Sequence, residues 1–449
     1  MSRLRSILPL AAALTAFGAP ATAHALTVDV QGPTLRVTAG PFETNRITVG
    51  VTSGKYVVRD DGTVVSQLST SGISALRVDL GDLDDTLTIA PEVTVGATLI
   101  DGPGNDTVTG GAKKDTFVGS PGDDTLLGGA GDDTFGDAGG TGADTIDGGA
   151  GWDVADLSGR TADLHVALDD VRNDGQAGED DDIRATVEQV DGGAGSDRLV
   201  GSDGPNTLRG NRGDDSFDGR GGADTYAGGD GQDAADYRAR STRVVVSADG
   251  TANDGAPGEN DNVGGDVDDL YGGTGDDELI GNSWWSTVDG GAGDDTLRAG
   301  GGDDTVVGGP GADTVQGGDG SDRLSGNEGD DTLQGGSGDD TLDGGSGADA
   351  LDGGAGTDVL DYRTRSGAIT VDLAAGTAGE AGEGRVVERR EQRGGAVVHL
   401  DRPHGAQLTR PDAAGEHPDA GDAQPAGRAD VPLGVAHEDA VPRTQPGPV

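Results

Sequence analysis

The chain has 449 residues, of which 86 are glycine and 81 are acidic while only 3% are aromatic, so it lacks the material for a large globular core. Its formal net charge of −50 argues against nucleic acid and anionic membranes as partners and favours bound cations, because carboxylates at this density repel one another. There is no cysteine, so no disulfide can stabilise the fold.

The N-terminal 25 residues have the pattern of a secretory signal peptide. Arg3 and Arg5 precede an apolar stretch from Ile7 to Phe17, and small residues follow up to Ala23-His24-Ala25. The apolar stretch is too short to cross a bilayer, which takes about 20 residues. We therefore expect cleavage after Ala25, with Ala23 as the alternative, and a secreted, soluble mature chain without a membrane span.

Residues 26–100 carry short alternating runs that are typical of strands. Examples are RITVGV at 46–51, KYVVRD at 55–60 and ALRVDL at 75–80, each bounded by glycine, aspartate or serine. This segment is predicted to be a β-rich cap at the N-terminal end of whatever follows.

A nine-residue repeat then fills three blocks, 101–156, 192–236 and 272–361, with one two-residue slip inside the first. Each unit follows G-G-x-G-x-D-x-U-x, where U is aliphatic. The composition alone would also suit a disordered acidic chain. Disorder, however, does not require an aliphatic residue at a fixed place in every unit.

Two segments of equal length, 157–191 and 237–271, separate the blocks and are copies of one insert, since each has an apolar run followed by NDGQAGED or NDGAPGEN. A partial third copy occupies 362–384. In residues 385–449 the nine-residue pattern is absent, and histidine and proline are more frequent than before. This tail is interpreted either as a frame-shifted sequence or as a natural disordered tail.

The unit of nine residues divides into a turn and a strand. Six glycine-rich residues suit the positive φ angles of a tight turn, and the last three suit a very short strand whose middle side chain points inward. Because each turn reverses the chain, two units close a coil of 18 residues, and strand n lies parallel to strand n+2. The sequence thus predicts an all-β fold, a parallel β-roll or solenoid with an aliphatic ladder inside. The ladder comprises Leu297, Val306, Val315, Leu324, Leu333, Leu342, Leu351 and Leu360.

Stacked turns of this kind would place carbonyl and carboxylate oxygens together along both edges of the roll. Such oxygen cages suit Ca²⁺, which takes 6 to 8 oxygen ligands. The repeats offer neither cysteine nor histidine for zinc or copper, and Mg²⁺ prefers strict octahedral geometry with retained waters. Multiple calcium ions are therefore the expected cofactors.

The repeats resemble the RTX, or hemolysin-type, calcium-binding nonapeptide repeats, whose parallel β-roll is built from this motif. The resemblance covers about 101–361 and implies that the sixth-position aspartates bind calcium together with carbonyl oxygens of the glycine-rich turns. Carried onto this chain, these aspartates are Asp106, Asp115, Asp124, Asp133, Asp144, Asp153, Asp197, Asp215, Asp224, Asp233, Asp277, Asp295, Asp304, Asp313, Asp322, Asp331, Asp340, Asp349 and Asp358.

Two units depart from the motif, with Asn206 and Ser286 in place of the sixth-position aspartate, and both are the second unit after an insert. Their calcium sites are therefore in doubt. The fifth-position acids, Asp123, Asp132, Asp294, Asp303 and Asp339, are interpreted as solvated surface carboxylates rather than ligands. Trp284 and Trp285 are expected to pack against the neighbouring insert rather than to form a platform for a sugar.

No catalytic motif accompanies the repeats. Between Leu26 and Gly384 the sequence has no H-E-x-x-H, no G-x-S-x-G and one histidine, His165, in an apolar run. We therefore expect no enzyme. The expected function is that of a secreted, extracellular calcium-binding protein with a structural, surface or matrix role, whose biological partner the sequence does not name.

Three alternatives remain open. The first is adhesin-like binding of a cell-surface or glycan partner through the inserts, and the second is a hydrolase remnant. The third is ice binding by outward threonines spaced about 4.8 Å apart, for which Thr296, Thr305, Thr314, Thr332 and Thr341 are the candidates and Arg323 and Ala350 are interruptions.

Overall fold

The computed structural model describes residues 26–136 and 141–361, together with the backbone of four later strands, β37 (Ile369–Asp372), β38 (Thr377–Glu380), β39 (Val397–His399) and β40 (Gln407–Thr409). The predicted signal peptide, 1–25, and most of the predicted tail, 385–449, lie outside the described residues. Within the described ranges every regular element is a strand. Accordingly, the described part of the chain offers no helix long and apolar enough to cross a membrane.

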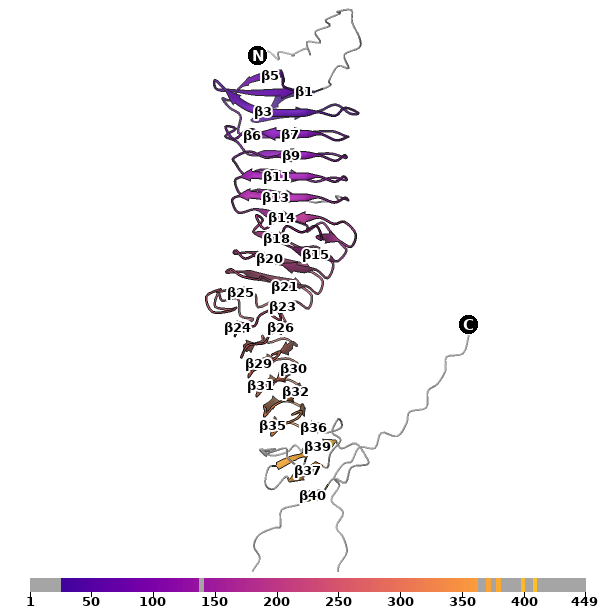
Figure 1. The fold of residues 1–449 in the computed structure, drawn as a ribbon, viewed down its shortest axis with the longest axis vertical. Helices are drawn as coiled ribbons and strands as arrows, with labels where there is room; N and C mark the ends of the chain where they lie inside the picture. The colour runs from indigo at the N-terminus through magenta and orange to yellow at the C-terminus, as the bar shows by residue number, and fades with distance from the viewer. Residues whose placement is uncertain are drawn as a thin grey trace, which may run out of the picture.

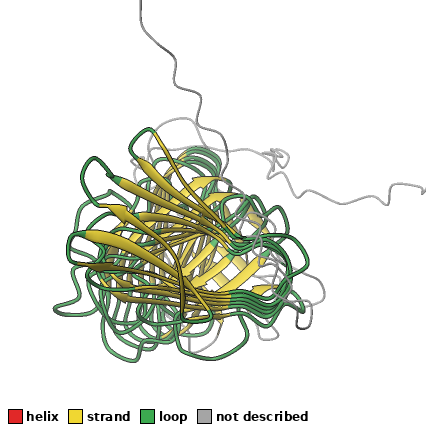
Figure 2. Ribbon diagram, turned by 90° about the horizontal axis from the view of Figure 1, so that it is seen from above, coloured by secondary structure: helices red, strands yellow, loops and turns green. Residues whose placement is uncertain are grey.

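Consecutive repeat units lie on opposite faces of one tall stack (Figure 1). In the third block β29 (Thr296–Gly301) pairs in parallel with β31 (Thr314–Asp319), Leu297 opposite Val315, so strands pair at a spacing of 18 residues. Figure 2, which looks along the stack, shows the strands of successive coils behind one another and the turns gathered at the edges. The predicted all-β parallel roll with two units per coil is confirmed.

Two sheets form the N-terminal half of the roll. The first has 11 strands in the spatial order β1 (Thr27–Gln31), β2 (Thr34–Thr38), β6 (Ala75–Asp79), β8 (Ala97–Ile100), β10 (Thr116–Val118), β12 (Thr134–Gly136), β14 (Val154–Asp156), β18 (Gln189–Asp191), β20 (Thr207–Arg212), β22 (Thr225–Asp230) and β25 (Asn262–Val263). The second has 8 strands in the order β17 (Asp182–Ile183), β13 (Thr145–Ala150), β11 (Thr125–Ala130), β9 (Thr107–Thr109), β7 (Thr86–Ile89), β3 (Arg46–Thr52), β4 (Lys55–Asp60) and β5 (Thr63–Ser69).

Two further sheets form the C-terminal half. The third has 12 strands in the order β16 (Gly175–Gln176), β15 (Leu164–Ala167), β19 (Arg198–Val200), β21 (Ser216–Asp218), β23 (Ala234–Asp236), β26 (Asp269–Tyr271), β28 (Thr287–Asp289), β30 (Thr305–Pro310), β32 (Arg323–Glu328), β34 (Thr341–Asp343), β36 (Val359–Asp361) and β39. The fourth has 6 strands in the order β24 (Val245–Ser247), β27 (Glu278–Ile280), β29, β31, β33 (Thr332–Ser337) and β35 (Ala350–Ala355). Strands β38, β37 and β40 form a separate small sheet.

The N-terminal segment closes the roll and also begins it. Strand β1 pairs antiparallel with β2, and β3, β4 and β5 form an antiparallel meander. Strands β7 and β8, however, already pair in parallel with β9 and β10 of the first repeat units, and β6 pairs in parallel with β8. Residues 26–100 therefore supply both the closing strands and the first coils.

The two inserts are junctions at which one sheet ends and another begins. At the first junction (157–191), β17 ends the second sheet by pairing with β13, while β15 starts the third. At the second junction (237–271), β25 ends the first sheet and β24 starts the fourth. The opposite face continues each time, through the pairs β14–β18 and β23–β26. At each junction the sheet on one face is therefore replaced by a new sheet, while the sheet on the other face continues.

A narrow ladder of apolar side chains fills the roll. Leu297, Val306, Val315 and Leu324 are at most 1% exposed, as the nine-residue pattern predicts. In the earlier coils aromatic rings replace aliphatic ones, and Phe117 stacks on Phe135 with ring centroids 4.5 Å apart. The threonines considered for ice binding fall into two columns, one on each face, which Arg323 and Ala350 interrupt.

Glycine is required where successive turns touch. Gly300 has φ +115°, and a Cβ placed there would lie 2.0 Å from the carbonyl oxygen of Asn282 in the preceding coil. Its neighbour Gly301 has no such φ, and a Cβ there would meet its nearest atom at 3.7 Å. The two adjacent glycines thus differ in how tightly the stack constrains them.

We expect Gly300→Ala to lower the free energy of unfolding by about 1–3 kcal/mol, because it combines left-handed backbone strain with a backbone clash. Gly301→Ala is the matched control and should change it by less than about 1 kcal/mol. Denaturant unfolding of both variants at saturating calcium measures the difference. Equal destabilisation by the two changes would mean that the turns do not stack as described.

Candidate metal centres

The sixth-position aspartates form columns that follow the coils. The backbone N–H of Asp313 donates to Oδ1 of Asp331, 18 residues on, at 2.8 Å, and the N–H of Asp304 donates to Oδ1 of Asp322 at 2.9 Å. All the aspartates predicted as ligands are buried. Each strand therefore begins beside the carboxylate of the next coil, on the same edge of the roll.

These hydrogen bonds connect all but one of the aspartates into five columns. The columns are Asp106–Asp124–Asp144, Asp115–Asp133–Asp153, Asp197–Asp215–Asp233, Asp277–Asp295–Asp313–Asp331–Asp349 and Asp304–Asp322–Asp340–Asp358. Asp224 accepts instead from the N–H of Asn206. The sequence placed these residues correctly at the two edges, but their role as ligands stays a prediction.

The second carboxylate oxygen is what marks these columns as cation sites. Oδ2 is buried and has no hydrogen-bond partner in Asp106, Asp133, Asp153, Asp215, Asp224, Asp233, Asp295, Asp304, Asp313, Asp322, Asp331 and Asp340. An anionic oxygen removed from water without a donor is costly. A hard cation that prefers oxygen ligands relieves that cost, so the residues present fit calcium.

Glycines border the free oxygens at positions where a side chain would clash. A Cβ at Gly308 would lie 2.4 Å from Oδ2 of Asp313 in the same turn, and one at Gly309 would lie 1.8 Å from the carbonyl oxygen of Gly291 in the preceding coil. Carbonyl and carboxylate oxygens are therefore concentrated at the same edge. The motif needs glycine here because any side chain would occupy the space between them.

Burial raises the pKa of many of these aspartates above the usual value of 3.8. The pKa rises to about 8 for Asp106 and Asp224, to about 7 for Asp295 and to about 6 for Asp313. Loss of water around the carboxylate is the largest cause, and neighbouring carboxylates such as Asp124 beside Asp106 add to it. Without a bound cation, the folded roll takes up protons near neutral pH.

This proton uptake predicts how the calcium-free protein responds to pH. The folded pKa values are raised to about 6–8, so the folded state binds more protons than the unfolded state above about pH 4, and stability falls as pH rises through that window. Protein freed of calcium by dialysis should therefore show more strand content by circular dichroism at about pH 5 than at about pH 8. Strand content that rises with pH would contradict the burial of these carboxylates.

Asn206 and Ser286 continue the columns without offering a carboxylate. The N–H of Asn206 donates to Asp224 at 2.8 Å and its Oδ1 accepts the N–H of Ser202 at 2.7 Å. Ser286 donates to Oδ1 of Asp304 from both its N–H and its hydroxyl. Both residues are neutral and hydrogen-bonded, so neither position requires a cation. Both stand in the second unit after a junction, so the departure occurs at the same place in each copy.

The structure adds aspartates that the repeat pattern did not identify. Asp85, in the first coils, accepts the N–H of Asn45 at 2.6 Å and has a free, buried Oδ2. Asp181 and Asp261, one in each junction, accept the N–H groups of Asp144 and Asp224 and extend those columns. The GDLDDTLT run and the duplicated NDG segments were the available signals, but they lie out of phase with the nonads.

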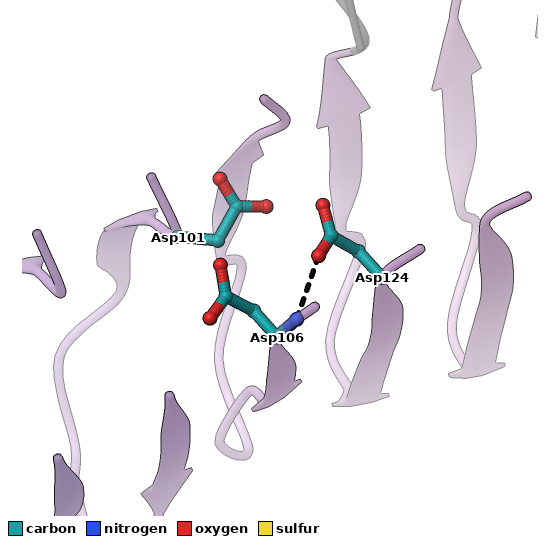
Figure 3. Close-up of side chains that lie close together, drawn as sticks. All are labelled: Asp101, Asp106 and Asp124. Carbon is teal, nitrogen blue, oxygen red and sulfur yellow. Dashed lines mark hydrogen bonds between the residues drawn. The ribbon is translucent and has the colours of Figure 1, made fainter. Parts of the chain in front are cut away.

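Three buried carboxylates come closest together at the start of the first block (Figure 3). Oxygens of Asp101, Asp106 and Asp124 all lie within 4.8 Å of one another, and the N–H of Asp106 donates to Asp124 at 2.7 Å. Asp101 replaces the first glycine of its unit and accepts hydrogen bonds from Gly102 and Ser120. It is a further candidate ligand that the motif did not predict.

The fifth-position acids are exposed, as predicted, but they also bind backbone. Oδ1 of Asp294 accepts the N–H of Ala312 at 2.8 Å, and that of Asp339 accepts the N–H of Thr357 at 2.7 Å. Asp123, Asp132 and Asp303 do the same one coil on. Interpreting them as merely solvated was therefore incomplete, because each one ties its turn to the next.

Comparison with known families agrees with this geometry. The family model of the RTX calcium-binding nonapeptide repeat, which describes four copies, matches residues 100–135, 138–159, 191–226, 200–234, 263–283, 289–324 and 325–360. A comparison with curated proteins found none that matches the chain.

Proposed function

We propose that this chain, a calcium-binding β-roll protein with RTX nonapeptide repeats within residues 100–360, is secreted and folds on extracellular calcium to serve a structural role at the cell surface or in the matrix. The observation that carries the proposal is the set of columns of buried aspartates, each with one oxygen bonded to the next coil and many with the other oxygen free. Calcium would join adjacent coils along both edges.

Within this proposal the sixth-position aspartates and the glycine carbonyls beside them hold the ions. Calcium supplies positive charge where neighbouring carboxylates repel one another, and the chain supplies the spacing, because its stacked turns repeat every 18 residues. Asp85 and Asp101 are added to the candidate ligands at the N-terminal end.

A fold that depends on a metal suits an exported chain that has no cysteine for disulfides. The chain has no cysteine and a net charge of −50, so at low calcium its carboxylates oppose folding. Extracellular calcium modules bind at about 10⁻⁴ to 10⁻³ M. The chain would therefore stay unfolded in the cytoplasm and fold outside the cell.

Two measurements on protein recovered from the culture medium test the proposal. Calorimetric titration should show several calcium equivalents per chain that equimolar magnesium does not replace. Intact mass should show a chain beginning at Leu26. A retained Met1 would contradict export, and binding of magnesium with equal affinity would contradict the calcium assignment.

Adhesin-like binding is the alternative, favoured by the exposure of residues 170–173 and 251–253 in the two junctions. A pull-down with cells or glycans, with and without calcium, distinguishes it from a purely structural role. We further propose that the chain is not an enzyme. In support of this, His165 lies in β15 with a buried, unpartnered Nδ1, and burial lowers its pKa.

A further inference from the structure

The second unit after the second junction carries an exposed pair of tryptophans that its counterpart after the first junction lacks. Trp284 and Trp285 are 65% and 60% exposed. They stand at the fourth and fifth positions of their unit, where the equivalent unit after the first junction has Gly204 and Pro205. Since the same junction folds with glycine and proline there, the indoles are not needed for packing. The expectation that they pack away against the insert is therefore only partly met.

The two indoles border a hollow of about 600 Å³ between the second block and the second junction. That volume is within the range of sites for small ligands. The polar side chains that line it are acidic or neutral: Asp214, Asp266, Asp268 and Gln232. No lysine or arginine lies among the residues that line this hollow.

Backbone contacts hold the tryptophan turn in place. The N–H of Trp284 donates to Oδ1 of Asn282 at 2.7 Å, and Nδ2 of Asn282 donates to the carbonyl oxygen of Val267 in the junction at 3.0 Å. The next coil covers the turn so closely that a Cβ at Gly302 would lie 2.4 Å from the backbone nitrogen of Trp285. The backbone of the turn that carries the two indoles is therefore fixed before any ligand arrives, which lowers the cost of binding.

The carboxylates are held in place as well. Oδ1 of Asp214 accepts the N–H of Gln232 at 2.9 Å, and Oδ2 of Asp266 accepts the N–H of Gly229 at 3.1 Å. Each of these bonds uses one oxygen and leaves the carboxylate its charge. The first junction has Thr186 where the second has Asp266, although Asp132 and Glu188 stand there in the places of Asp214 and Asp268. The indole pair and the carboxylate of Asp266 therefore occur together at the second junction and are both missing at the first.

We infer that this hollow is a binding site for an organic cation of the guanidinium or ammonium type, held over the indole faces and by the carboxylates. Tryptophan is the strongest aromatic partner for a cation, and three carboxylates in a lining without lysine or arginine favour a positive ligand over a neutral sugar. The ligand is either a free small cation or a basic side chain of a partner protein. The site depends on a folded roll but not on export or on a matrix role.

The test uses the full chain at saturating calcium in a Trp152→Phe background, so that Trp284 and Trp285 are the only tryptophans. Acetyl-arginine amide is titrated by fluorescence and calorimetry, with the neutral isostere acetyl-citrulline amide and methyl glucoside as comparisons. Binding of the arginine probe alone supports the site. A capped Gly-Gly-Arg-Gly-Gly peptide that binds more tightly indicates a protein partner, and equal affinity indicates a free cation.

Matched variants convert the second junction toward the first. Asp266→Thr should weaken binding of the arginine probe about fivefold or more, and Trp284→Gly with Trp285→Pro should abolish it. Calorimetry reports on the double variant, and unchanged circular dichroism and calcium dependence show that the roll itself is intact. Binding of the glucoside, equal binding of the citrulline probe, or loss of the arginine signal once calcium exceeds the level that saturates the roll would each overturn the inference.

Discussion

Chelation of calcium is expected to unfold the roll from residue 101 to residue 361. Most strands of the repeat blocks contribute only one large apolar side chain to the interior, the chain has a net charge of −50, and the buried columns bring carboxylates together. Without cations the folding gain of such a core does not offset the repulsion and the entropy of ordering. Far-UV circular dichroism should lose its strand signal on chelation, and the hydrodynamic radius should increase.

The transition should reverse when calcium is returned at about 10⁻⁴ to 10⁻³ M. Magnesium at the same concentration is the matched control, because it matches the charge but prefers a strict octahedral shell. Strand content that survives chelation would refute calcium-coupled folding.

Paired substitutions should reveal which aspartates share a site. Asp313 and Asp331 are bonded across one coil, whereas Asp322 lies on the opposite face of the roll. Replacing Asp313 and Asp331 by alanine should therefore be non-additive in calcium affinity by about 0.5–3 kcal/mol, since the second loss falls on a site already broken. Replacing Asp313 and Asp322 should add to within about 0.5 kcal/mol.

Calorimetric titration of the full chain measures both cycles. Asp331→Asn is the control within the first pair, because it keeps an oxygen to accept the N–H of Asp313 but removes the charge. Loss of affinity in this variant without loss of strand content would assign the effect to the ion rather than to the hydrogen bond. Stronger coupling in the pair nine residues apart would contradict the two-unit coil.

The sequence was sufficient for the roll because its period is a local property. Leu297 and Val315 recur in phase, and the same phase places Asp295 and Asp313 at one edge. The aspartates of the junctions could not be predicted in this way. Asp181 and Asp261 join the columns through loops of another length, so counting in nines cannot find them.

The exchange of sheets at the junctions could not be predicted from the sequence either. The duplication of 157–191 and 237–271 indicated one recurring element but not what it does. Whether β15 and β17 join the same sheet or different ones depends on partners far along the chain, which no local pattern specifies. The N-terminal segment shows the same limit, because its alternating runs predicted strands but not their alignment with the repeat units.

The sheets on the two faces of the roll end at different heights, because only one sheet is replaced at each junction. The second sheet stops at the first junction while the first sheet runs past it, and the first sheet stops at the second junction while the third runs past that. At the two junctions within the described residues, therefore, the end of one sheet lies opposite a continuous sheet. A pull along the axis must break hydrogen bonds within a continuous sheet at every height, so the junctions are not seams where the rod parts first.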